Sequence, residues 1–293
     1  MTLVDEKVVA PPTEPPPARS GARSQAVPWR RWAINAGVFA GVIAAWWGLT
    51  ASGLIAPLFL PSPQAVVAAF IDANSCRPIQ EGSARIVCGS QGYFLWEHLL
   101  ASLQRIGVGV VFGVILGVLL GYTMALVPVF GRLFEPYLNF LRSLPPLGYI
   151  GLLIVWFGIG DTSKVWLLFL AAFPPIAMAT IDGVRGIRVD RIQAAQAMGA
   201  KPAHVLRHVI IPASLPSILS GIRIATGFAW TTVVAAELNN GIPGIGGLAY
   251  LAGTQLQTPL TIACIIVIGL AAIALDGGIK YLAGLLVPWQ GKA

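Results

Sequence analysis

Few residues of this 293-residue chain are spaced to do covalent or metal chemistry. His204 and His208 stand four apart, a spacing at which two histidines on one helix can share a metal ion, but no third ligand accompanies them. Serine, histidine and acidic residues occur without the arrangement of a catalytic triad. The stretch GIGDTSK (158–164) lacks the spacing of a phosphate-binding loop. The sequence therefore predicts no catalytic residue, no cofactor and no metal ion.

Two of the three cysteines, Cys76 and Cys88, share one polar segment, CRPIQEGSARIVC. No histidine lies near them and no C-x-x-C spacing occurs, which argues against a zinc site. An extracytoplasmic position would permit a disulfide between them. A disulfide and two unpaired thiols therefore both remain open.

Composition indicates that these residues belong to a membrane protein. The chain is 56% hydrophobic and 11% charged, with a mean hydropathy of +0.76, whereas a soluble protein carries roughly 25% charged residues. The formal charge of +7 sits in segments between apolar runs, so we expect membrane lipid around the chain and no nucleic-acid partner. Residues 1–31, rich in Pro, Ala, Ser and Arg, are expected to form a disordered tail. A transmembrane domain over 32–290 would follow.

Six apolar segments are long enough to cross a bilayer core, which takes about 20 residues. They are 32–55, 98–126, 136–158, 164–184, 214–238 and 259–282. Because backbone amides in lipid must bond within their own segment, each is predicted to be a helix. Lys and Arg concentrate in the tail, after the second segment and in loop 185–212. The positive-inside rule therefore places both termini and this loop in the cytoplasm, and loop 56–97 outside.

Two patterns predict how the helices pack. In the second segment a glycine recurs every four residues, at Gly109, Gly113, Gly117 and Gly121. This series would let a neighbouring backbone approach closely, either within the chain or in a second copy. The pairs Pro145-Pro146 and Pro174-Pro175 are expected to break or bend the third and fourth helices. Broken helices at membrane depth line cavities or lie against protein, so a gated path and a static packing kink both remain open.

Ionisable residues near these segments are candidates for a polar path. Glu237, at the end of the fifth segment, either contacts such a path or faces water, and Arg142 either attracts an anion or only obeys the positive-inside rule. Asp276 and Lys280, four apart in the last segment, are expected to neutralise each other. The predicted path residues are Arg142, Pro145, Pro146, Trp230, Glu237 and Asn239.

The stretch QAAQAMGAKPAHVLRHVIIP (193–212) contains the clearest series of helix start and stop signals of any predicted loop. A short Ala-rich helix would end at Gly199, which can take a left-handed conformation. Pro202 suits the first turn of a second helix, with His204 on its polar face, and Pro212 would stop that helix. The pattern predicts a compact helix–turn–helix at the membrane surface that docks into a cleft of a soluble partner.

This stretch also resembles a known motif. Ala194-Ala195, Gly199, the aliphatic residues at 209 and 211, and Pro212 look like the EAA signature of the permeases of ATP-binding cassette (ABC) importers, with Gln193 where the signature has Glu. The stretches 56–67, 143–164 and 227–248 resemble the nitrate, sulfonate and taurine permeases within that class, and the taurine permeases most. The resemblance covers roughly residues 32–290, apart from the Cys76–Cys88 segment.

The resemblance implies an all-α membrane protein of six transmembrane helices with a cytoplasmic EAA-type coupling loop, the type I ABC importer permease fold. It implies a subunit that is not an enzyme and that works in the bacterial inner membrane. Its implied partners are a second copy of itself, an ATP-binding subunit dimer and an extracytoplasmic substrate-binding protein. The residues implied to contact the ATPase are Gln193, Ala194, Ala195, Gly199, Ala200, Lys201, His204 and Pro212.

The substrate implied by the resemblance is a small sulfonate such as taurine, and nitrate or another small organic anion is the alternative. An ion-coupled secondary transporter would need carboxylates deep in the spans. Only Asp276 and Glu237 come near this requirement, and both are predicted toward segment ends.

Overall fold

The structure is a computed structural model that describes residues 28–78 and 86–289. Nearly all of the predicted tail 1–31 lies outside the described residues. The chain divides into two units, 1–46 and 47–293. The described part of the first unit is the beginning of α1 (Pro28–Ala51), a helix that is apolar and long enough from Ala33 to Ala51 to cross a membrane.

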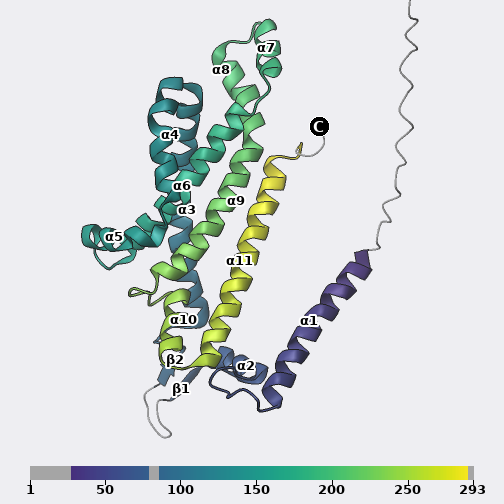
Figure 1. The fold of residues 1–293 in the computed structure, drawn as a ribbon, viewed down its shortest axis with the longest axis vertical. Helices are drawn as coiled ribbons and strands as arrows, with labels where there is room; N and C mark the ends of the chain where they lie inside the picture. The colour runs from purple at the N-terminus through teal and green to yellow at the C-terminus, as the bar shows by residue number, and fades with distance from the viewer. Residues whose placement is uncertain (1–27, 79–85, 290–293) are drawn as a thin grey trace, which may run out of the picture. The chain divides into compact units, whose positions relative to one another are not determined.

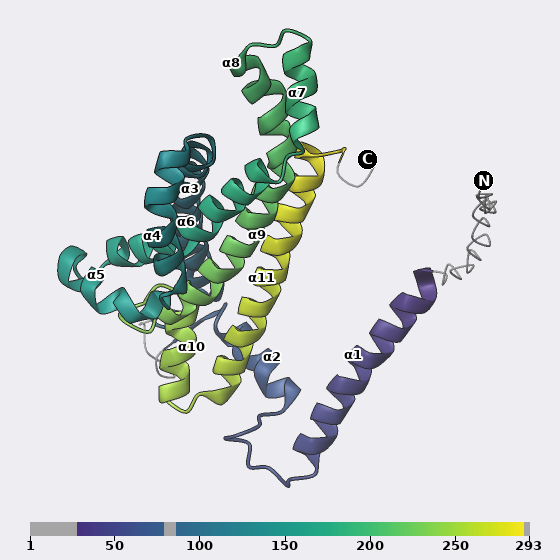
Figure 2. The same ribbon diagram turned by 45° about the horizontal axis from the view of Figure 1, so that its top comes forward.

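The second unit is almost entirely helical. Its elements are α2 (Pro63–Asp72), β1 (Cys76–Pro78), β2 (Ile86–Cys88), α3 (Leu95–Leu126), α4 (Pro128–Ser143), the 3-10 turn η1 (Pro146–Tyr149), α5 (Ile150–Phe157), α6 (Asp161–Arg185), α7 (Val189–Ala197), α8 (Pro202–Val205), the π-turn η2 (Leu206–Ile210), α9 (Ile211–Ala236), α10 (Ile245–Thr254) and α11 (Thr258–Leu286). Figures 1 and 2 show α7 and α8 at one end of the long helices, and the β1–β2 hairpin and α10 at the other. These are called the α7–α8 end and the hairpin end.

Five helices of the described chain are long and apolar enough to cross a membrane: α1, α3, α6, the run from α8 to α9, and α11. The remaining predicted segment, 136–158, is two helices, Pro128–Ser143 and Pro146–Phe157, bent by 95°. Leu144 and Pro145 are extended between them. The break predicted at the first proline pair is therefore confirmed.

The second proline pair does not break its helix. α6 runs without interruption from Asp161 to Arg185 through Pro174 and Pro175. Each proline removes one backbone hydrogen bond, but α6 is packed tightly between two neighbouring helices. Close contact on both sides holds the helix together across the pair.

One of these neighbours is α3, through its glycine series. A Cβ added at Gly109 or Gly121 would lie 2.6 Å from Leu168 Cβ or 2.5 Å from Thr180 Cβ, and at Gly113 or Gly117 it would lie 3.0 Å from Ala172 or Ile176 side-chain atoms. The α6 partners also recur every four residues, so two faces of equal repeat are in register. The close neighbour of the glycines is thus within the chain.

The other neighbour of α6 is α9. A Cβ at Gly183 of α6 would lie 2.8 Å from Ser217 Cβ, and Gly221 of α9 packs against Ala179. Leu168, Ile176 and Ala225 have no exposed surface in this region. α6 is therefore the central helix, and α3 and α9 are closely fitted to its two sides.

Pro212 does not end the helix that begins at Pro202, contrary to the sequence prediction. One helix of 35 residues runs from Pro202 to Ala236, because the π-turn η2 joins α8 to α9. In this turn the Ile211 N–H bonds to Leu206 O, and the wider turn just before Pro212 accommodates a residue that has no N–H to donate. Ser214 Oγ donates to Ile210 O at 2.8 Å and lies 2.6 Å from Tyr122 Oη of α3.

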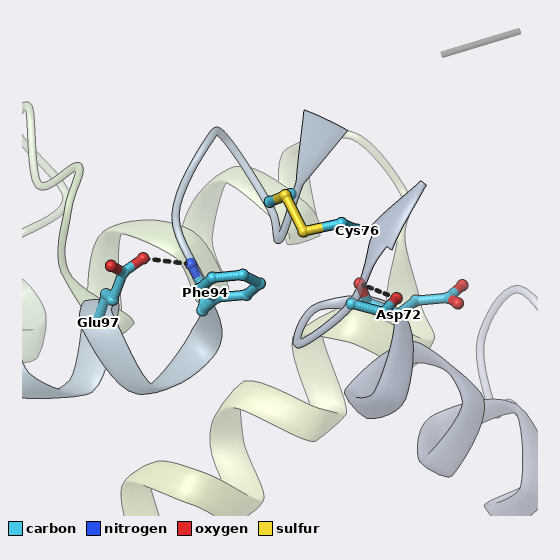
Figure 3. Close-up of a disulfide and its surroundings, with 6 residues drawn as sticks. Asp72, Cys76, Phe94 and Glu97 are labelled. Atoms are coloured by element: carbon cyan, nitrogen blue, oxygen red, sulfur yellow. Dashed lines mark hydrogen bonds between the residues drawn. A yellow bond between two sulfur atoms is a disulfide. The ribbon is translucent and has the colours of Figure 1, made fainter. Parts of the chain in front are cut away.

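The hairpin end is built from short elements between α2 and α3. β1 and β2 pair antiparallel with Cys76 opposite Cys88, and the two sulfurs form a disulfide (Figure 3). At the start of α3 the Phe94 N–H donates to the Glu97 carboxylate at 2.7 Å. The predicted outer loop 56–97 therefore contains a helix and a cross-linked hairpin.

Candidate functional site

A cavity of about 720 Å³ opens where α4 breaks off. Its wall is formed by the end of α4, the turn η1, one face of α6 and one face of α9. Of the predicted path residues, Arg142, Pro145 and Pro146 line it, whereas Trp230, Glu237 and Asn239 do not. The broken helix thus lines a cavity, as helices interrupted at membrane depth usually do.

The cavity wall is mostly apolar and carries two charged residues, Arg142 and Asp182. Both are exposed to the cavity rather than buried. No hydrogen bond or ion pair within the described part of the chain engages either charged side chain. The wall also carries hydroxyl groups, at Ser143, Tyr149, Ser217 and Ser220. An apolar wall with a few polar groups suits a small polar solute whose orientation those groups fix.

Trp230 lies in the helix core instead. Only 6% of its surface is exposed, and it packs with Ile106, Leu168 and Val233. Its indole N–H has no hydrogen-bond partner among the described residues. Asn239 is exposed, in the connection that follows α9.

Glu237 does not face water, which was one of the two positions considered for it, and it does not line the cavity at the α4 break. It is 1% exposed, and its carboxylate accepts hydrogen bonds from Arg105 Nη1 at 2.6 Å, Ser102 Oγ at 2.7 Å and the Gly246 N–H at 2.9 Å. A buried carboxylate is stable only when paired and hydrogen-bonded. Both conditions hold here, so Glu237 joins α9 to α3 at the hairpin end.

The same network holds the connection between α9 and α10. Arg105 also donates from Nε to Asp161 at 2.9 Å and from Nη2 to Pro243 O at 2.7 Å. Lys164, 3% exposed, donates to Asn240 O at 2.6 Å, and a ring nitrogen of the buried His98 lies 3.2 Å from Gly244 O. Three buried side chains from α3 and α6 therefore fix the backbone of this connection.

Arg105 and Lys164 were not among the functional residues predicted from the sequence. The available signal was an arginine inside the apolar run 98–126, since an ionisable residue in such a run normally has a partner and a role. The partner could not be read locally, because Glu237 is 132 positions away.

Asp276 forms its ion pair with Arg223 rather than with the predicted Lys280, which contributes a charge attraction without direct contact. Arg223 of α9 contacts the Asp276 carboxylate of α11 through Nε and through Nη2, the latter at 2.7 Å. The planar guanidinium presents two parallel donors that match both carboxylate oxygens, which a lysine four residues along the same helix does not offer.

The α7–α8 unit (Val189–Val205) has the predicted helix–turn–helix form. Gly199 is left-handed with φ +83°, its N–H bonds to Gln196 O at 2.9 Å, and the Ala200 N–H bonds to Ala195 O at 3.1 Å. These two bonds make a Schellman ending for α7, and Pro202 opens α8 as predicted.

The residues predicted to contact a partner separate into exposed and anchoring groups. Those on the open surface are Gln193, Ala194, Gly199, Lys201 and His204. Ala195 is 8% exposed and packs with Val184, Ile187 and Val205, and Ala200 and Pro212 are half-buried. Sequence analysis missed Met198, which is 83% exposed at the tip of the unit.

The His204 and His208 rings stack 4.2 Å apart on this exposed face. No group of three histidine, cysteine, aspartate or glutamate residues that could hold a metal ion occurs over 28–78 and 86–289.

Apolar helices of membrane length, a cavity with a few polar groups at a helix break, and a helical pair protruding from one end define a membrane translocation subunit. The family of binding-protein-dependent transport system inner membrane components matches residues 109–288, and the chain belongs to this family. It is a non-catalytic, multi-pass inner-membrane subunit of an ABC importer. This membership implies ATPase and substrate-binding partners.

Relatives and solved structures agree with this assignment. The chain is 39% identical to the taurine transport system permease protein of Escherichia coli (strain K12), over 90% of the chain and 92% of that protein. It is 32% identical to the bicarbonate transport system permease protein of a Synechocystis species, over 67% and 70%. The fold matches a chain of the inward-facing MetNI methionine ABC transporter with a TM-score of 0.56 and 20% identity, covering 66% of this chain and 95% of that one.

Proposed function

We propose that this chain forms the membrane path of an importer for small sulfonates such as taurine, driven by ATP hydrolysis on a separate subunit. The observation that supports taurine as the substrate is the 39% identity to a taurine permease over nearly the full length of both proteins. Nitrate or another small anion is the second candidate, favoured by the bicarbonate permease among the relatives.

The proposed path runs through the cavity at the α4 break. Arg142 is a cation on its wall without a partner among the described residues, so it is available to an anionic head group entering the cavity. Pro145 and Pro146 keep the helix open at this point, because they hold the backbone extended and η1 starts a new direction. Glu237 and Trp230 are buried among the helices and would stabilise the path without lining the cavity.

The α7–α8 unit is the proposed contact with the ATP-binding subunit. Its tip exposes Gln193, Ala194, Met198 and Lys201, whereas Ala195 anchors it to the base of α6. The long apolar side chain of Met198, with the small residues Ala194 and Gly199 close to it in sequence, can enter a cleft on a partner, as helices do when they dock in grooves. The proposal places this end and both termini in the cytoplasm, consistent with the Lys and Arg pattern.

The assembly proposed is two copies of this chain, two ATP-binding subunits and an extracytoplasmic binding protein. Apolar side chains along α3, among them Val111, Ile115 and Leu119, are more than half exposed and would face lipid. The hairpin end would face the binding protein.

Uptake by the reconstituted complex tests the substrate. The full chain, its co-purified ATPase and its binding protein are placed in proteoliposomes, and ATP-dependent uptake of labelled taurine is measured with nitrate and bicarbonate as competitors. Arg142→Gln should lower uptake at least about fivefold, because it removes the cation of the cavity. Arg132→Gln, on the same helix but outside the cavity, should leave uptake within twofold. Taurine uptake that does not require ATP would refute the proposal.

Glycine replacement tests the contact with the ATPase. Gly199→Val forces a branched residue into a left-handed conformation, at about 1–2 kcal/mol, and should release the ATPase during purification. Gly92 has the same φ of +83° and equally open surroundings at the hairpin end, so Gly92→Val imposes matched strain and should retain the ATPase. Equal loss of ATPase in both variants would contradict the assignment.

A further inference from the structure

We infer that the cavity recognises its solute as a zwitterion, with a positive side formed by Arg142 and an acceptor side formed by α6. This inference rests on the proposed function and narrows its substrate class, from small anions in general to molecules that carry a strong-acid group and an ammonium group. Taurine, 2-aminoethanesulfonate, belongs to this class, whereas nitrate and unsubstituted alkanesulfonates do not.

The positive side lies at the end of α4. Arg142 stands in the last turn of that helix, next to Ser143, and both residues line the cavity. A guanidinium group offers planar pairs of N–H donors that fit the oxygens of an acidic head group. Since no carboxylate of the described chain binds Arg142, all its donors remain open to a solute.

The acceptor side lies along α6. Pro174 and Pro175 have no N–H to give to the carbonyl oxygens of Leu170 and Ala171, four residues earlier. Leu170 and Ala171 both line the cavity, as does Asp182 on the same helix face. The Asp182 carboxylate is the charged acceptor of this side, and it lies about 16 Å farther along α6 than the two carbonyl oxygens, at roughly 1.5 Å per residue.

The two sides do not neutralise each other. Arg142 and Asp182 line one cavity of about 720 Å³, yet no ion pair within 4 Å joins them, in contrast to Arg185 and Glu135 nearby, which pair at 2.5 Å. Opposite charges held apart across an apolar space leave a field between them. A solute with separated charges aligns with this field, and a simple anion satisfies only one side.

This polarity can be measured by thiol labelling, without transport. Ser143→Cys reports the positive side, and Ser217→Cys reports the acceptor side, since Ser217 packs against Gly183 beside Asp182. The probes are the anionic 2-sulfonatoethyl and the cationic 2-aminoethyl methanethiosulfonates, applied to the complex in nanodiscs. Background reaction should be low, because Cys76 and Cys88 are bonded to each other and Cys264 is buried.

The expected result is a ratio of anionic to cationic labelling rates that is about tenfold higher at Ser143→Cys than at Ser217→Cys. Adding Arg142→Gln should lower the ratio about fivefold at position 143 only, and adding Asp182→Asn should raise it about fivefold at position 217 only. Asp72→Asn, at the hairpin end and outside the cavity, is the control and should change neither.

Equal ratios at the two positions, or ratios that do not respond to neutralising Arg142 and Asp182, would overturn the inference. A measurement of taurine uptake by the unmodified complex distinguishes failure of this inference from failure of the proposed function. If the unmodified complex imports taurine but the ratios are equal, the inference fails and the sulfonate importer stands. If the ratios differ as expected and no taurine is imported, the proposed function fails while the polarity of the cavity stands.

Discussion

Gly121→Ala tests whether the fit between α3 and α6 sets the stability of the membrane domain. The added methyl carbon would lie 2.5 Å from Thr180 Cβ and 2.8 Å from Ala177 O, where van der Waals contact needs about 3.4–4 Å. Ala177 O is a backbone atom and Thr180 Cβ is bonded directly to the backbone, so neither atom can rotate away. The two helices must therefore separate by about 1 Å.

The size of the effect follows from two opposing terms. Overpacking of a closely fitted contact costs about 1–3 kcal/mol, and the upper end applies here because backbone atoms are in the way. Replacing glycine by alanine within a helix returns about 1 kcal/mol. The expected net loss is about 2 kcal/mol, which lowers Tm by about 4–8 °C for a domain of this size.

Gly107→Ala is the matched control on the same helix. A Cβ at Gly107 meets nothing within 4 Å, so only the gain in helix propensity remains, and Tm should rise by about 2–4 °C. Gly113→Ala, with its closest contact at 3.0 Å, should fall between the two. The assay is the fraction of purified complex that stays monodisperse after heating. If Gly107→Ala and Gly121→Ala lowered Tm equally, the fit of α3 on α6 would not be the cause.

Three further predictions concern two ion pairs and the disulfide. Glu237→Gln should destabilise the complex by about 1.5–3 kcal/mol in the same heating assay, because the buried Arg105 charge then keeps only the exposed Asp161 as a counter-charge; a change below about 1 kcal/mol would contradict the buried pair. Asp276→Asn should lower Tm more than Lys280→Gln does, since Asp276 forms the ion pair with Arg223 of α9. A larger decrease for Lys280→Gln would instead indicate that Asp276 pairs with Lys280 within α11. The unmodified protein should react with maleimide only after its disulfide is reduced, whereas Cys76→Ser should react without reductant, through the freed Cys88 thiol. Equal labelling of the unmodified protein and the variant before reduction would show that Cys76 and Cys88 are free thiols.

Local spacing predicted the features whose causes are local. The glycine series of α3 indicated a close helix contact because a four-residue repeat keeps small residues on one face. Gly199 and Pro202 indicated a turn because each acts on the backbone within a few residues. Pro145-Pro146 indicated a break for the same reason. These predictions needed no knowledge of which helix lies opposite.

Contacts between distant segments were beyond the sequence patterns. Asp276 was assigned to the lysine on its own helix, because the i, i+4 pattern is visible and the approach of α9 is not. Glu237 could not be matched with Arg105 for the same reason. Pro174-Pro175 was expected to break or bend α6, and it does not break it, because packing against two neighbours outweighs the lost hydrogen bonds. The helix continues through Pro212 by way of a π-turn, which no short sequence motif predicts.

The helix from Pro202 to Ala236 is continuous, so a displacement at one of its ends can be transmitted to the other. At about 1.5 Å per residue it is about 52 Å long, and Gly221, packed closely on Ala179 of the central helix, lies about 28 Å from one tip and about 22 Å from the other. A tilt about this fulcrum would move the two tips in opposite directions by similar distances. A displacement of the α8 end would therefore produce an opposite displacement at Ala236, where the helix meets the Arg105–Glu237 network.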